Sequence, residues 1–177
     1  MKCFYYLTGT LESTRKISDN LQNAGIDNWF IHVLSKDEAG LKKDKIHSSN
    51  YFEQLDILRY GIIGAAIGFL VALIAVALIV STKLFGPDMP NIVYYAMIAV
   101  LTLFGSWEGG LIGIASENKK IKLFNHDLEL GKFLILIYSK KDSEDRVKKI
   151  MVAQHPEAQL VAVDANFYNP LTNLKRL

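Results

Sequence analysis

The chain has 177 residues and a formal net charge of +2, with hydrophobic residues making up 50% and charged residues 21%. Its single cysteine, Cys3, excludes an intramolecular disulfide framework and any metal site built on paired cysteines. The small net charge, together with the lack of a segment that interleaves basic and aromatic residues, argues against a nucleic-acid-binding protein.

The first predicted elements are a strand, a helix and a second strand. Residues 3 to 8 are rich in aromatic side chains and residues 29 to 34 alternate in polarity, so both segments are predicted strands. Between them, residues 14 to 24 place their apolar side chains on one helical face, and Gly25 follows as a left-handed C-cap. Residues 1 to 50 therefore predict the first βαβ half of a cytoplasmic domain.

Two long apolar stretches come next, residues 60 to 80 and residues 92 to 115. A hydrocarbon core about 30 Å thick needs roughly 20 apolar residues as helix, whereas a buried helix of a soluble domain seldom exceeds about 14. We therefore expect a transmembrane hairpin whose surroundings are the lipid bilayer.

Each span is predicted to lie within a longer helix. Asn50 has the spacing of an N-cap, so the first helix is expected to run unbroken over residues 51 to 82. Asp88 is suited to a helix start, and the second helix is expected over residues 91 to 130. On this interpretation residues 51 to 130 form a helical stalk together with the transmembrane hairpin.

The distribution of Lys and Arg predicts the orientation of the hairpin. Eight basic residues precede the first span and eleven follow the second, whereas the connector between the spans has only Lys83. Cytoplasmic loops are enriched in Lys and Arg, so both termini are expected in the cytoplasm and the connector outside. Lys119, Lys120 and Lys122 follow the second span, where they would face anionic lipid or simply enforce this topology.

The second soluble segment, residues 131 to 177, repeats the pattern of the first. Residues 132 to 139 are predicted as a strand, residues 143 to 154 as a helix and residues 158 to 164 as the last strand. Two βαβ units that pair into one sheet make a ferredoxin-like split βαβ domain, here interrupted between its second and third strands. The predicted fold class is therefore an α+β membrane protein in which a two-helix hairpin interrupts a ferredoxin-like domain.

Small residues recur every four positions in both spans. Ridges of this kind let helix backbones approach closely, which is how helices associate in lipid. The two ridges either join the hairpin within one chain, or at least one of them also joins neighbouring chains. The ridge residues, which we take as the candidate helix-packing and oligomerisation positions, are Gly64, Gly68, Ala72, Gly105, Gly109 and Gly113.

Three short segments, together with the spaced glycines, carry a resemblance to a known family. They are Glu-Ser-Thr-Arg-Lys at residues 12 to 16, Leu-Gln-Asn-Ala-Gly-Ile at residues 21 to 26 and Leu-Glu-Leu-Gly-Lys at residues 128 to 132. The chain resembles small bacterial inner-membrane proteins of unknown function, which are often automatically labelled magnesium transporters or general-stress proteins. The resemblance implies a multi-pass protein of the bacterial inner (cytoplasmic) membrane, although the first span has fewer glycines than the usual pattern.

Glu108 is the single ionisable side chain well inside either span. A carboxylate inside the membrane is energetically costly and is therefore a candidate functional group, which could bind a cation, relay a proton or accept hydrogen bonds from a neighbouring helix. The alternative is a structural role, in which Glu108 is protonated or extends to the nearby membrane interface and is held by a partner. Transport of magnesium would need several oxygen ligands. The spans otherwise offer only Thr102 and Ser106.

No pattern in the sequence indicates catalysis. There is no dinucleotide or phosphate-binding glycine motif and no nucleophile elbow, so we expect no catalytic residue, no cofactor and no enzymatic activity. His47 and His126 could meet in the fold, but neither has the spacing of a metal ligand, and no metal site is predicted.

Two functions remain as hypotheses. The first is a non-enzymatic, homo-oligomeric scaffold or regulatory assembly at the cytoplasmic face of the membrane, with an unidentified cytoplasmic protein as a possible partner. The second is a transporter or channel for a cation, magnesium among the candidates, that uses Glu108. Because no polar stripe runs along the spans, the sequence favours the first.

Overall fold

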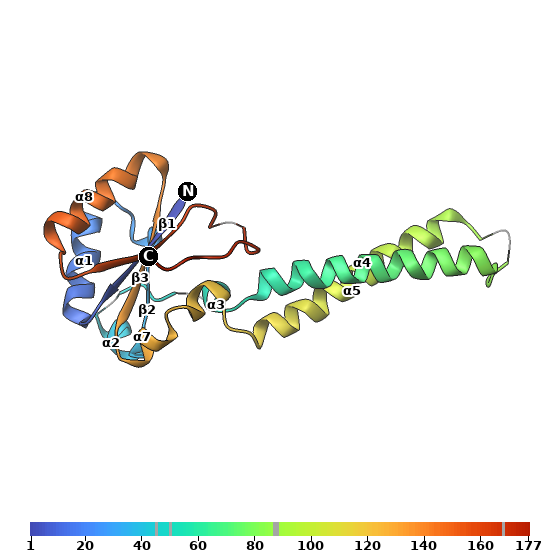
Figure 1. Ribbon diagram of the computed structural model, residues 1–177, viewed down its shortest axis with the longest axis horizontal. Helices are drawn as coiled ribbons and strands as arrows, with labels where there is room; N and C mark the ends of the chain where they lie inside the picture. Colours follow the sequence, from blue (N-terminus) through green and yellow to red (C-terminus); the bar gives the residue numbers. More distant parts are fainter. Residues whose placement is uncertain (45, 50, 87–88, 168) are drawn as a thin grey trace. The chain divides into compact units, whose positions relative to one another are not determined.

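A computed structural model describes residues 1–44, 46–49, 51–86, 89–167 and 169–177. The chain forms two compact units: Met1–Tyr51 with Lys119–Leu177, and Phe52–Asn118. We call the first the sheet unit and the second the hairpin unit. The protein is α+β, with a four-stranded antiparallel sheet and two long apolar helices (Figure 1).

The sheet joins strands from both ends of the sequence. Its order is β2-β3-β1-β4, with β1 at Lys2–Thr8, β2 at Ile31–Leu34, β3 at Phe133–Ser139 and β4 at Gln159–Asp164. β1 lies beside β3, and the pair is antiparallel over its whole length, with Tyr5 opposite Leu136. The segments before and after the long apolar helices therefore share one sheet.

The helices of the sheet unit are short, and several of them were not expected from the sequence. The predicted helices are present as α1 at Leu11–Asn23 and α8 at Glu144–Gln154. The remaining helical elements are η1 at Asn28–Phe30, α2 at Glu38–Lys43, α6 at Lys119–Lys122, α7 at Asn125–Glu129 and η2 at Lys141–Ser143.

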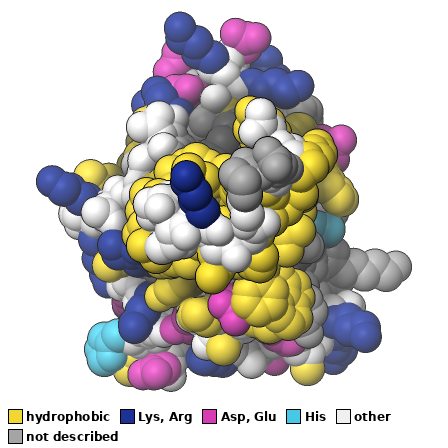
Figure 2. Space-filling view, turned by 90° about the vertical axis from the view of Figure 1, so that its right-hand side faces the viewer, with side chains coloured by type: hydrophobic (Ala, Val, Ile, Leu, Met, Phe, Trp, Pro, Cys, Tyr) yellow, Lys and Arg dark blue, Asp and Glu magenta, His cyan; other side chains and the backbone are white. Residues whose placement is uncertain are grey.

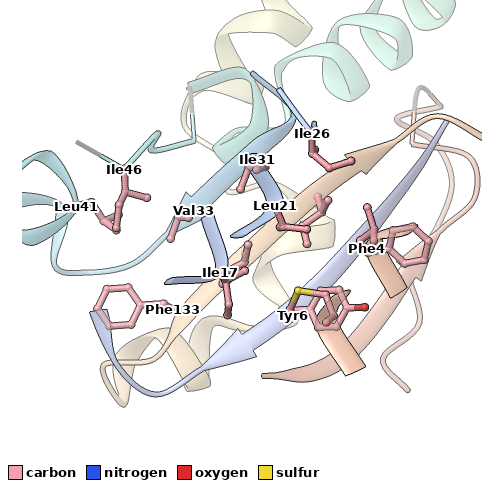
Figure 3. Close-up of a cluster of buried hydrophobic side chains, with 14 residues drawn as sticks. Phe4, Tyr6, Ile17, Leu21, Ile26, Ile31, Val33, Leu41, Ile46 and Phe133 are labelled. Carbon is pink, nitrogen blue, oxygen red and sulfur yellow. The ribbon is translucent and has the colours of Figure 1, made fainter. Parts of the chain in front are cut away.

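Alternating side chains give the central strands two buried faces. Phe4 and Tyr6 of β1 point to one face, and Cys3, Tyr5 and Leu7 point to the other, as the two-residue period of a strand requires. On the first face, these side chains pack with apolar residues of α1, α2 and α8 (Figure 3). The larger buried side chains of this face are Ile17, Leu21, Leu41, Ile135, Val147 and Met151.

The second face is covered by α6, α7 and the C-terminal segment. Phe124 is fully buried there, and its ring stacks on Tyr5 with the centroids 5.7 Å apart. Leu174 is also buried in this layer, and the Leu177 amide donates to the Val161 carbonyl at 2.8 Å. The last residues of the chain are therefore part of the fold of the sheet unit.

Both edges of the sheet are covered by segments of the same chain. At β2, the Val33 amide donates to the His47 carbonyl and the Ser49 amide donates to the Val33 carbonyl, each at 3.0 Å. At β4, Ala162 forms an antiparallel bridge with Arg176. These contacts leave fewer free backbone groups at the two edges for another chain to extend.

The hairpin unit contains α4 at Ile57–Thr82 and α5 at Asn91–Ile114, which lie side by side. Both are long and apolar enough to cross a membrane. A short helix, α3 at Tyr51–Gln54, precedes α4. Hydrophobic side chains gather over the hairpin (Figure 2).

The expectation of two unbroken helices over residues 51 to 82 and 91 to 130 is wrong. The first is interrupted between α3 and α4, and the second ends at Ile114. The reason is a short antiparallel contact at the open end of the hairpin, where the Asp56 amide donates to the Ser116 carbonyl at 3.0 Å and the Asn118 amide donates to Gln54 at 2.8 Å. These hydrogen bonds between two segments of the same chain replace helical ones.

The glycine cap that the sequence predicts at Gly25 is present in the structure. Gly25 has a φ of 85° after α1, and the Ile26 amide donates to the Leu21 carbonyl at 3.0 Å. The proposed N-cap Asn50 and the proposed helix-start residue Asp88 lie outside the described residues.

Candidate functional site

Five glycines bring the backbones of α4 and α5 into direct contact. A Cβ atom added at Gly64 would overlap the Gly105 carbonyl oxygen, and one added at Gly109 would overlap the Tyr60 carbonyl oxygen. At Gly113 the added atom would lie 2.6 Å from the Ile57 Cα. No larger residue fits without moving the helices apart, since real Cβ atoms do not approach backbone so closely. The five positions are Gly64, Gly68, Gly105, Gly109 and Gly113.

The predicted ridges therefore pack on each other within one chain, which is one of the two alternatives that the sequence left open. Ala72 continues the contact and is fully buried. Gly110 is different, because an added Cβ there has no atom within 4 Å. We refer to the six ridge residues together as the small-residue contact. Its backbone surface is occupied by the partner helix of the same hairpin.

Glu108 lies on the outside of this hairpin. Its side chain is exposed, and among the described residues it has no hydrogen-bond or ion-pair partner. The neighbouring Phe104 and Trp107 are also exposed, and their rings lie 5.7 Å apart. Glu108 thus does not line a path between α4 and α5. In contrast, the Thr102 hydroxyl donates to the Ile98 carbonyl of its own helix at 2.7 Å.

The lysines after α5 do not all face outward, which corrects the prediction for Lys120. This residue is buried, and its Nζ donates to Asp164 Oδ2 at 2.6 Å and to the Asn169 carbonyl at 3.2 Å. A lysine buried within the sheet unit cannot also face lipid. Lys119 is exposed and donates to Asn173 Oδ1 at 2.6 Å, and Lys122 is exposed.

A second buried carboxylate, Asp127, also belongs to this region. Lys132 Nζ donates to its Oδ1 at 2.8 Å, and Arg176 lies 2.7 Å from its Oδ2. The hydrogen bond from Lys132 holds the pKa of Asp127 below its usual value of 3.8, against the effect of burial, and Arg176 lowers the pKa further. These ion pairs connect α7 to the start of β3 and to the end of the chain.

A polar pocket that the sequence did not reveal lies between α1 and the segment after α8. His155 is buried, with Nε2 3.1 Å from Asn20 Nδ2 and Nδ1 3.3 Å from Glu157 Oε1. The Ser13 hydroxyl donates to Glu157 at 2.7 Å and lowers the pKa of this carboxyl. Because both ring nitrogens of His155 are engaged, the network links the two segments structurally. No spacing in the sequence relates residues so far apart.

Among the described residues, no ring contact joins His47 to His126. His47 lies next to His32, with ring centroids 4.8 Å apart, and Trp29 contacts both rings. His126 is exposed on α7 and belongs to neither ring pair. Within the described ranges, no group of three or more His, Cys, Asp or Glu side chains could hold a metal ion.

Comparisons with family models, with curated proteins and with solved structures found no match to the chain.

Proposed function

We propose that the protein is a non-enzymatic integral membrane protein that forms a homo-oligomeric scaffold or regulatory assembly at the cytoplasmic face of the membrane. One observation carries the proposal. The hairpin turns its small residues inward and its large apolar side chains outward, so its stable surroundings are apolar. Among the described residues of α4, Ala72 alone is buried. A helix pair with this surface would be unstable in water.

The sheet unit is proposed to be a ferredoxin-like split domain with the hairpin inserted into it. Two features support this assignment: the strand order β2-β3-β1-β4, and the placement of α1 and α8 on the same face of the sheet. In a split βαβ arrangement each helix follows the first strand of its unit, as α1 follows β1 and α8 follows β3.

The proposed location is the bacterial inner membrane, with both termini in the cytoplasm. The excess of Lys and Arg outside the connector supports the orientation, and the family resemblance supports the location. Lys119 and Lys122, which are exposed, would then stand on the cytoplasmic side, where basic residues interact favourably with anionic lipid. The partners are the bilayer, further copies of the chain and an unidentified cytoplasmic protein.

The competing function is cation transport through Glu108. The outward position of Glu108 argues against a path within one hairpin, because the backbones of α4 and α5 lie directly against each other at the small-residue contact. A conducting path would then have to form between chains, and it would need more oxygen ligands than one carboxylate per chain supplies. The scaffold is therefore the better supported function.

The test combines particle mass with ion flux. In detergent or nanodiscs, the scaffold proposal expects a discrete particle of several chains, and Glu108→Gln proteoliposomes should match wild type in a cation flux assay. A monomeric particle would refute the assembly. Magnesium or monovalent cation flux that disappears in the Glu108→Gln variant, with the particle mass unchanged, would establish the transporter instead.

A further inference from the structure

The outer face of α5 carries a row of large apolar side chains at alternating spacings of four and three residues. Their exposed fractions lie between 48% and 62%. This spacing, repeated over two heptads, is that of the contact line of a parallel helix pair. We call the row the outer face; its members are Val100, Phe104, Trp107, Leu111 and Ile114.

Glu108 stands beside this row, next to Trp107 in the sequence, and has no partner among the described residues. A carboxyl group inside a span needs a hydrogen-bond donor or another means of neutralisation. The same face offers one donor, the indole N–H of Trp107, whose side chain is 59% exposed. The face thus carries both an unpartnered acceptor and a donor.

The outer side of α4 is also exposed and apolar, with Ile67, Leu70 and Ile74 each more than half exposed, but residues 61 to 80 include no polar side chain. Several other surfaces are covered by the chain itself. The small-residue contact is filled by the partner helix, and segments of the same chain cover both sheet edges and the second sheet face. The outer face of α5 differs from these surfaces because a polar group there lacks a partner.

We propose that the outer face of α5 docks against the same face of a second copy, with the two-fold axis along the membrane normal. Such an axis places each residue at the depth of its own counterpart. Trp107 of one copy then donates its indole N–H to Glu108 of the other, and the reverse contact forms by symmetry. The inference rests on the proposed homo-oligomer and names the surface through which it assembles.

Disulfide scanning tests the proposed surface directly. Cys3→Ala provides a cysteine-free background, and single cysteines are placed at Phe104, Trp107 and Leu111 in turn. Two-fold symmetry brings each cysteine next to its own copy, so oxidation in native membranes should give covalent dimers at all three positions. Two exposed positions off the face, Ile112 on α5 and Ile62 on α4, are the matched controls and should give few dimers.

The role of Glu108 is tested in the same membranes with two substitutions. Glu108→Gln keeps an acceptor, so dimerisation should stay near wild type. Glu108→Leu removes the acceptor, and the dimer dissociation constant, measured by energy transfer between labelled chains in nanodiscs, should rise about tenfold. If Glu108 only reached a lipid headgroup, Glu108→Leu would leave dimerisation unchanged or strengthen it, which would overturn the proposed contact.

Particle mass separates this inference from the proposed function. An oligomer whose disulfides form at Ile112 or Ile62 rather than on the outer face would overturn the surface and leave the assembly intact. A monomer in detergent and in nanodiscs would overturn both. An oligomer with disulfides at the three face positions, weakened by Glu108→Leu, supports the inference.

Discussion

The two units of the chain bury opposite kinds of residue. In the sheet unit, large side chains such as Phe4, Tyr5 and Phe124 are fully buried between a sheet and the helices on its faces. In the hairpin unit, glycine backbones fill the contact and large side chains point outward. The first unit makes its own apolar interior, whereas the second depends on apolar surroundings.

The two units also differ in how they treat their charged groups. The sheet unit pairs its buried charges internally, as Lys120 with Asp164 and Asp127 with Lys132 and Arg176. The hairpin unit leaves Glu108 outside its own contact, without a partner in the part of the chain that the structure describes. These buried charges of the sheet unit therefore have structural roles, while the exposed Glu108 is available for contacts outside its own chain.

The largest expected effect comes from breaking the interior of the sheet unit. Ile135 is fully buried in the middle of β3, so Ile135→Asp places an uncompensated charge in the core and should cost more than about 4 kcal/mol. Limited proteolysis should then cleave the segments on both sides of the hairpin, since they share one sheet. Val152→Asp, at a position that is 80% exposed, is the control. Protection of residues 1 to 44 in the Ile135→Asp protein would contradict a shared core.

The buried pair of Lys120 and Asp164 should produce the next largest effect. Lys120→Met leaves Asp164 buried without its cation, and loss of one partner of a buried pair costs about 3–5 kcal/mol. Chemical denaturation followed by tryptophan fluorescence would measure the change in the free energy of unfolding.

Two further variants test whether the effect of Lys120→Met comes from the buried ion pair. Lys122→Met changes an exposed lysine of the same helix and should alter stability by less than about 0.5 kcal/mol. The double variant Lys120→Met with Asp164→Leu should recover most of the loss, because no charge then remains buried. Equal effects of Lys120→Met and Lys122→Met would show that Lys120 is not buried as described.

A smaller effect is expected in the hairpin. Gly109→Ala places a methyl group against the Tyr60 backbone, so α4 and α5 must move apart, at a cost of about 1–3 kcal/mol. Gly110→Ala is the matched control, because its Cβ enters open space. Distances between spin labels on the two helices, measured by pulsed electron paramagnetic resonance, should increase for Gly109→Ala alone. The same distance in both variants would contradict the small-residue contact.

The smallest expected effect is a dependence on pH. Because the folded pKa of Asp127 lies below its usual value, its contribution to stability is present at neutral pH. This contribution is lost from about pH 5 downwards, as the pH falls through the lower folded pKa. In acid titrations, Asp127→Asn should therefore lose less stability than wild type, whereas Glu129→Gln, at an exposed carboxylate of the same helix, should behave as wild type.

The sequence predicted the elements whose signal is local. The first strand, the helix before Gly25 and the two long apolar stretches correspond to observed elements, whereas the predicted second strand begins only at Ile31, because Trp29 and Phe30 belong to η1. The unbroken helices failed because hydrogen bonds between Asp56 and Ser116 and between Gln54 and Asn118 join residues far apart in sequence. The burial of Lys120 was missed for the same reason, since its partner Asp164 lies 44 residues away. For the ridge glycines, spacing predicted a close contact, and only the fold showed which surface they meet.

Accessibility of single cysteines in intact cells tests whether the hairpin crosses the membrane from a cytoplasmic sheet unit. In the Cys3→Ala background, Leu84→Cys lies between the long helices and Val152→Cys lies on α8, and both side chains are exposed. A membrane-impermeant thiol reagent should label Leu84→Cys in intact cells and Val152→Cys only after permeabilisation. Labelling of Val152→Cys with protection of Leu84→Cys would reverse the orientation, and release of the protein from membranes by alkaline carbonate would contradict the claim altogether.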